Sequence, residues 1–251
     1  MDSIRRFAVA QLFWVLSFVM SAASTAFAQS PAEFERVLLP ICVSRVPGAY
    51  GTLWSTELWY RNNSEDPVAI LPLAVSDYVP TIGQTVLLPV GSFPASAPGQ
   101  ILFVERRGGS AVQFDLRLLD ESNPAGAWGT KLPVVRETEL GRTVSLINIP
   151  TGFDFRSALR IYGVPDDPGG TETVRVRIYS GDEDVLVDEE IVLTGFPRYG
   201  AILSLADAFP EIRHAERVRI HVEAVNPNAR IWAFVGVTSN HTQNVSIVTP
   251  N

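Results

Sequence analysis

The sequence predicts an all-β protein that is exported and folds as two β-sandwich domains in tandem. Apolar and polar residues alternate with a period of two along most of the chain, as in half-buried strands. Turn residues such as Asn62-Asn63-Ser64 and Gly181-Asp182 separate these segments. Only residues 203–212 are expected to form a helical turn, which Pro210 interrupts. Closely spaced strands without intervening helices are typical of sandwiches or barrels.

The first residues are predicted to be a secretory signal. Arg5 and Arg6 precede an apolar run at residues 7–20, and Ala26-Phe27-Ala28 matches an A-x-A cleavage site. The apolar run is shorter than the ~20 residues that a membrane-spanning helix needs. We therefore expect residues 1–28 to be removed, which leaves a mature chain that begins at Gln29. An uncleaved membrane anchor is the alternative. The expected location is the periplasm, the cell surface or the medium.

The strands follow in order along the mature chain. In the first half, alternation predicts strands at residues 37–43, 53–61, 68–75, 84–90, 100–106, 112–120 and 131–136. In the second half, it predicts strands at residues 144–149, 157–162, 172–180, 184–193, 201–205, 216–224, 230–238 and 244–248.

The two halves are weakly similar to each other. Trp54-Ser55-Thr56-Glu57-Leu58 occupies the same relative place as Phe155-Arg156-Ser157-Ala158-Leu159, and a loop and a second strand follow in both. We therefore expect a first Ig-like or fibronectin-like β-sandwich at residues 29–139 and a second at residues 140–251. One large jelly-roll sandwich is the alternative.

Three segments carry a family resemblance: Arg36-Val37-Leu38-Leu39-Pro40, residues 47–58 and residues 237–245. They resemble segments of uncharacterised secreted bacterial proteins with tandem Ig-like β-sandwich domains. The resemblance covers most of the mature chain and consists of strand and loop patterns. It implies the fold and bacterial export, and it supplies no activity and no functional residues.

Composition narrows the possible partners. Apolar residues make up 46% of the chain and charged residues 19%, which is typical of a globular protein. The net charge of −7 disfavours nucleic acid and anionic membranes as partners. No segment after the signal is apolar enough to cross a membrane. Cys42 is the only cysteine, so no intrachain disulfide forms, and its apolar neighbours predict a buried thiol.

We find no motif for catalysis, metal or cofactor binding. The three histidines lack the H-E-x-x-H spacing of zinc enzymes, and the G-x-S-x-G motif of serine hydrolases is absent. The acidic turns Asp166-Asp167 and Asp182-Glu183-Asp184 lack the ligand spacing of a calcium loop. We therefore expect no enzyme activity and no cofactor. A Ser-His-Asp triad assembled from distant loops stays open.

Trp59 is expected on the outer face of its strand. Alternation places Trp54, Thr56, Leu58 and Tyr60 toward the core and Ser55, Glu57, Trp59 and Arg61 toward solvent. An exposed tryptophan beside charges can stack on a sugar ring, or it can lie under a neighbouring loop or domain.

A second candidate surface lies in the second half. We expect the strands at 172–180, 216–224 and 230–238 to share one sheet, as the third, sixth and seventh strands of an Ig-like sandwich do. Their outward residues would then form a contact face for an acidic polymer, a partner protein or the first domain. Its residues are Arg175, Arg177, Arg219, His221, Trp232 and Phe234. In the alternative, Trp232 and Phe234 pack against the first domain or the arginine stems.

Two classes of function fit these observations. The first is a non-catalytic extracellular module for adhesion, surface architecture or protein interaction. The second is a carbohydrate-binding protein or an accessory to polysaccharide processing, which Trp59, Trp128 and Trp232 would support. A protein or a glycan at the cell surface is the expected partner. The oligomeric state is open.

Overall fold

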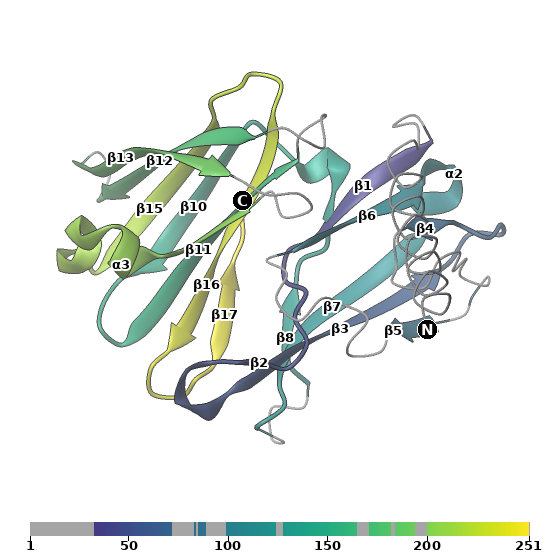
Figure 1. The fold of residues 1–251 in the computed structure, drawn as a ribbon, viewed down its shortest axis with the longest axis horizontal. Helices are drawn as coiled ribbons and strands as arrows, with labels where there is room; N and C mark the ends of the chain where they lie inside the picture. Colours follow the sequence, from purple (N-terminus) through teal and green to yellow (C-terminus); the bar gives the residue numbers. More distant parts are fainter. Residues whose placement is uncertain are drawn as a thin grey trace, which may run out of the picture.

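The computed structural model describes residues 33–71, 83, 85–88, 99–123, 128–164, 171–181, 184–193 and 200–250. The predicted signal peptide and its cleavage site lie outside these residues. The described chain is all-β, because its strands form four antiparallel sheets joined by turns and a few short helical segments (Figure 1).

Residues 34–136 form two sheets, on the right in Figure 1. The β1 sheet has the strand order β4-β6-β1-β9, with β1 at Phe34–Leu39, β4 at Ile70–Leu71, β6 at Gln100–Glu105 and β9 at Val135–Arg136. The β3 sheet has the order β2-β3-β7-β8, with β2 at Val46–Pro47, β3 at Leu53–Asn62, β7 at Val112–Asp120 and β8 at Thr130–Leu132. Strand β5, at Thr85–Leu88, also pairs with β3.

The two sheets face each other over a first hydrophobic core. Side chains of the β1 sheet, such as Leu39 and Leu102, are buried together with Leu58, Tyr60 and Leu116 of the β3 sheet. Cys42 belongs to this core and is fully buried, as predicted. Its burial raises the pKa of its thiol, which therefore stays protonated.

Residues 143–248 form the other two sheets, on the left in Figure 1. The β15 sheet has the order β10-β15-β12-β13, with β10 at Thr143–Pro150, β12 at Glu172–Ser180, β13 at Asp184–Leu193 and β15 at Arg217–Ala224. The β16 sheet has the order β14-β11-β16-β17, with β11 at Phe155–Val164, β14 at Gly200–Ser204, β16 at Arg230–Ser239 and β17 at Val245–Val248.

A second core fills the space between these sheets. Val176, Ile178 and Ile220 of the β15 sheet are buried against the β16 sheet, which contributes Leu159 and Val235 among others. Phe209 and Ile212, from the short helical segments α3 (Leu205–Ala208) and η4 (Pro210–His214), are buried in the same core. These segments fall where the sequence predicts one helical turn interrupted by Pro210.

Strand β16 is buried on both faces and joins the two halves. Its alternate residues Ile231, Ala233 and Val235 point into the second core. Trp232 and Phe234 point the other way and pack into the first core together with Tyr162 of β11. The rings of Tyr162 and Phe234 are stacked, with centroids 6.3 Å apart, and the Tyr162 hydroxyl donates a hydrogen bond to the Pro40 carbonyl.

The segment between the halves is held to β16. Gly141 and Ile231 exchange two backbone hydrogen bonds, of 3.0 and 2.7 Å, and Leu140 is buried in the first core. Arg230 also donates to the Leu140 carbonyl, at 3.3 Å. The domain boundary near residue 140 stays a prediction, and the chain at that point is tied down by hydrogen bonds.

Most predicted strands are present with small shifts at their ends, and those predicted at 68–75 and 84–90 lie partly outside the described residues. The predictions for β7, β12 and β13 match the structure at both ends. The predicted strand at 131–136 is two strands, because Pro133 has no amide proton to pair and the chain there passes from the β3 sheet to the β1 sheet. Strand β2 and three short helical turns were not expected: η1 (Ala49–Gly51), α2 (Arg106–Gly109) and η3 (Glu137–Glu139).

One prediction about the second half is wrong. Strands β12 and β15 pair with each other as expected, but β16 pairs with β11 in the opposite sheet. The physical reason lies in residues 231–235, which are apolar on both faces and are all buried. Such a strand needs cover on both sides, and the outer face of the β15 sheet does not provide it.

Candidate binding site

The predicted contact face is therefore divided between two places. Arg175, Arg177, Arg219 and His221 lie on the outer face of the β15 sheet, on the neighbouring strands β12 and β15. Trp232 and Phe234 are 5% and 0% exposed and lie between the two halves of the molecule. They contact the first half, which is the alternative that the sequence left open for these two residues.

Acidic neighbours pair with two of these arginines. Arg175 donates two hydrogen bonds to the Asp188 carboxylate, of 2.5 and 2.6 Å, and Arg177 lies 3.6 Å from both Asp188 and Glu223. The hydrogen bond from Arg175 lowers the pKa of Asp188. Arg219 lies over the ring of Tyr179, with 4.3 Å between its guanidinium carbon and the ring centroid. The face therefore carries little unpaired positive charge.

A serine and a histidine meet on the same face. Ser145 Oγ and His221 Nδ1 are 3.0 Å apart. Burial and the charge of Arg177 lower the pKa of His221, which favours the neutral ring. Within the described residues, no carboxylate is hydrogen-bonded to the other ring nitrogen, so the orienting third group of a catalytic triad is missing there.

Trp59 lies on the outer face of the β3 sheet, as predicted, with 37% of its surface exposed. Strand register places Asp115 of β7 beside it on one side and Leu87 of β5 on the other. Two residues away along β3 and β7, the same face carries Glu57 opposite Arg117. The neighbouring strand β8 carries Lys131 opposite Arg117. Two residues away in the other direction, the same face carries Arg61 opposite Gln113.

All of these side chains except Leu87 line an open hollow of about 810 Å³. We call it the tryptophan hollow and define it by Glu57, Trp59, Arg61, Arg117, Trp128 and Lys131. It extends past the edge of β7, where β8 pairs only with residues Leu116–Leu118.

Trp128 is held over the same sheet by its backbone and by Arg117. Gly129 has a φ of +64°, and a Cβ there would lie 2.6 Å from the Leu118 carbonyl oxygen, so this turn requires glycine. Arg117 donates to the Trp128 carbonyl, at 3.1 Å, and its guanidinium carbon lies 4.2 Å from the centroid of the indole ring. The Trp128 side chain is nevertheless 78% exposed.

The charges of the hollow are only partly paired. Two nitrogens of Arg117 donate to Asp115 Oδ2, at 3.0 and 2.9 Å. The Trp59 indole lies 3.5 Å from a Glu57 oxygen. Arg61 donates to the Asn63 side chain, and neither Arg61 nor Lys131 has a carboxylate partner among the described residues. The hollow thus combines two exposed indoles with two cations, Arg61 and Lys131, and one carboxylate, Glu57, that have no ion pair among the described residues.

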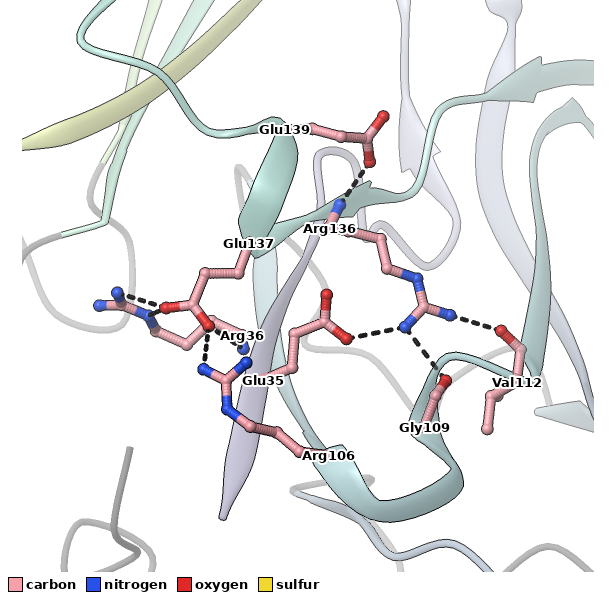
Figure 2. A network of polar contacts seen from close by, with 8 residues as sticks. All are labelled: Glu35, Arg36, Arg106, Gly109, Val112, Arg136, Glu137 and Glu139. Carbon is pink, nitrogen blue, oxygen red and sulfur yellow. Dashed lines mark hydrogen bonds and ion pairs between the residues drawn. The ribbon is translucent and has the colours of Figure 1, made fainter. Parts of the chain in front are cut away.

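A third polar cluster has a structural role. Glu137 accepts hydrogen bonds from Arg36 at 2.8 Å and from Arg106 at 2.7 Å, and it lies between them in Figure 2. Arg136 bonds Glu35 and the carbonyls of Gly109 and Val112. These charges belong to β1, β9, α2 and η3, and each of the two glutamates bonds an arginine. The cluster holds the β1 sheet together and leaves no evident place for a ligand.

The described residues hold no group of three or more histidine, cysteine, aspartate or glutamate side chains that could bind a metal ion. Of the acidic turns, Asp166, Asp167, Asp182 and Glu183 lie outside the described residues. None of the helices in the described part of the chain is long and apolar enough to cross a membrane.

Comparison with known proteins gives no match: no family model, curated protein or solved structure is significantly similar to the chain.

Sequence reasoning identified Trp59 and named Trp128, but it did not bring them together. It missed Arg117 and Lys131 altogether. The β3–β7 pairing that assembles the hollow joins residues about 55 positions apart, such as Trp59 and Asp115, and local patterns carry no signal for such a pairing.

Proposed function

We propose that the chain is exported after removal of residues 1–28 and acts outside the cytoplasm as a non-catalytic binding module built from two Ig-like sandwiches. The alternation of strands, the signal-like N-terminus and the two separate cores support this proposal. Of the two ligand classes that the sequence leaves open, protein and glycan, the tryptophan hollow favours a glycan.

The observation that carries the glycan proposal is the pair of exposed indoles in one polar hollow. Sugar rings have an apolar face that stacks on an indole and hydroxyl groups that need hydrogen-bond partners. Trp59 and Trp128 supply the flat apolar surfaces, and Glu57, Arg61, Gln113 and Lys131 surround them with donors and acceptors. An open hollow on a sheet face suits a chain of sugars better than a small enclosed ligand.

A polysaccharide binding assay with the purified mature chain tests this function. We expect the Trp59→Ala and Trp128→Ala variants each to bind the best polysaccharide about tenfold more weakly, which corresponds to ~1.4 kcal/mol for a lost stacking contact. Phe153→Ala is the matched control, because Phe153 is 93% exposed and lies outside the hollow. Equal binding by the tryptophan variants and the wild type would refute the site.

Export has its own test. The intact mass of the protein recovered outside the cytoplasm should correspond to a chain that begins at Gln29. A mass that still includes Arg5 and Arg6 would contradict the predicted cleavage.

A further inference from the structure

The tryptophan hollow holds two cations that have no carboxylate partner in the described chain. The whole chain carries a net charge of −7, yet Arg61 and Lys131 lie in the hollow without a carboxylate partner among the described residues. Elsewhere on the described surface, Arg175 and Arg107 have acidic partners within 3.5 Å, whereas Arg213 and Arg217 bond a carbonyl or amide oxygen and form no ion pair among the described residues. A neutral sugar does not require such cations, whereas an anionic ligand does.

The two cations lie on strands β3 and β8. The register places Asp115 of β7 midway between them, with Trp59 beside Asp115 on β3. Along β7, the positions opposite Arg61 and Lys131 are Gln113 and Arg117, four residues apart, and β3 and β8 lie on opposite sides of β7. With ordinary strand dimensions, the Cα atoms of Arg61 and Lys131 are therefore about 16 Å apart. If both side chains stand straight out from the sheet, their charged ends are farther apart than one sugar ring is long, and a ligand that contacts both contains more than one sugar unit.

The charge of Arg117 is paired with Asp115, and its guanidinium packs against Trp128. Its guanidinium is bound to Asp115 and lies against one face of the Trp128 ring, so it stiffens that indole. The cations that remain for a ligand are the fork of Arg61, which matches carboxylate or sulfate geometry, and the point charge of Lys131.

We propose that the tryptophan hollow binds an acidic oligosaccharide, with Arg61 and Lys131 contacting carboxylate or sulfate groups on two different sugar units and Trp59 stacking on a sugar ring beside Arg61. This inference rests on the proposed glycan-binding function and names the class of glycan.

The test compares three polymers at one ionic strength: polygalacturonate, dextran sulfate and unmodified dextran. We expect the mature chain to bind an acidic polymer at least tenfold more tightly than dextran, and added salt to weaken that binding. The comparison of polygalacturonate with dextran sulfate shows whether carboxylate or sulfate is preferred.

Charge variants then locate the contact. Arg61→Gln and Lys131→Gln are each expected to weaken binding of the acidic polymer about threefold, and the double variant about tenfold. Arg107→Gln is the matched control, since Arg107 is an exposed arginine of the first half outside the hollow, and it should bind like the wild type. Thermal unfolding should show the same stability for the wild type and all four variants, because the changed side chains are on the surface.

The possible results separate the two proposals. Equal binding of dextran and the acidic polymers, still lost in Trp59→Ala, would overturn the inference and leave the glycan function standing. Equal weakening by Arg107→Gln and Lys131→Gln would show general charge attraction and would also overturn the inference. Binding of no polymer, or binding unaffected by Trp59→Ala and Trp128→Ala, would overturn both.

Discussion

Arg117 and Arg136 show that the partners of an arginine decide what the residue can do. Both line the tryptophan hollow, but Arg117 is bonded to Asp115 and Arg136 to Glu35. Each has a local structural task, and a ligand would have to displace a carboxylate to use them. Arg61 and Lys131 have no such acidic partner in the described chain. The same distinction separates the hollow from the β15 sheet, where Asp188 and Glu223 pair with the arginines.

Single residues also show what alternation can predict. Trp59 and Arg61 are exposed and Leu58 and Tyr60 buried, as the period of two predicts. Ser55 was expected on the outer face, yet it is buried, and its hydroxyl donates to Glu121 at 2.5 Å and accepts from the Arg45 amide. A small hydroxyl can be buried when the fold supplies partners, and no local pattern announces those partners.

Glu137 gives a prediction about pH. Burial raises the pKa of Glu137, but hydrogen bonds from Arg36 and Arg106 and the charge of Arg36 outweigh it, so the pKa is lowered. A carboxylate whose pKa is lower in the folded state stabilises the fold above its ordinary pKa, and that stabilisation is lost as pH falls through the lowered value. Glu137→Gln should therefore cost about 1–3 kcal/mol in the free energy of unfolding at pH 7 and progressively less below about pH 4.

Urea unfolding at several pH values measures this effect. Glu65→Gln is the control, because Glu65 is an exposed carboxylate of the same half with no ion pair among the described residues. Its stability should follow that of the wild type throughout. A loss in Glu137→Gln that is the same at pH 7 and at pH 3 would show that the ionised carboxylate is not the cause.

At the level of whole strands, the sequence predicted where the strands lie better than which strands pair with each other. The bounds of β7, β12 and β13 follow from alternation and flanking turns, both of which are local. The place of β16 was missed, although the uninterrupted apolar run at residues 231–235 is typical of a strand buried on both faces. The observed pairing of β12 with β13 places Asp188 and Glu190 opposite Arg177 and Arg175, and the short turn between these two predicted strands is a local signal for that pairing.

This pairing predicts that the outer face of the β15 sheet gains affinity for anionic polymers when a paired carboxylate is removed. Because Asp188 pairs with Arg175 and Arg177, we expect Asp188→Asn to create affinity for dextran sulfate on this face. The measurement is made in a chain that also carries Trp59→Ala and Trp128→Ala, so that the hollow contributes little. Glu189→Gln is the matched control, because it removes the same charge from the opposite face of the same strand.

The reverse change tests the arginines themselves. In a chain with an intact hollow, Arg177→Ser combined with Arg219→Ser should leave binding of acidic polymers unchanged, because Arg177 is already paired and Arg219 lies on Tyr179. Weaker binding with unchanged stability would instead restore the β15 face as the contact surface.

At the scale of the whole molecule, β16 makes the two cores depend on each other. Its one face completes the second core, and its other face, through Trp232 and Phe234, completes the first. Arg156 of β11 adds a further contact between the halves, since its guanidinium carbon lies 5.0 Å from the centroid of the Tyr50 ring of the first half. We therefore expect the halves to form one rigid unit despite their separate cores.

This coupling changes the expectation for proteolysis. A boundary near residue 140 alone predicts cleavage between Glu137 and Arg142, but Gly141 is hydrogen-bonded to Ile231 and Leu140 is buried. A protease needs several residues of extended, accessible chain, so trypsin should cut slowly after Arg142 in the native protein. Rapid cleavage there, with two folded fragments, would show that the halves are independent domains.

Removal of the Phe234 ring should weaken the contact between the two halves. Phe234 is fully buried, so Phe234→Ala leaves a cavity between the halves and should cost about 3–5 kcal/mol in the coupling of the two cores. We expect faster tryptic cleavage after Arg142 and, in urea, two separate unfolding transitions in place of one.

Phe209→Ala is the matched control, because Phe209 is equally buried but lies wholly in the second core. It should destabilise that core without opening the segment around Gly141 under conditions where circular dichroism shows the protein folded. If both variants open that segment equally, β16 transmits general instability and the aromatic contact of Phe234 has no special role in joining the halves.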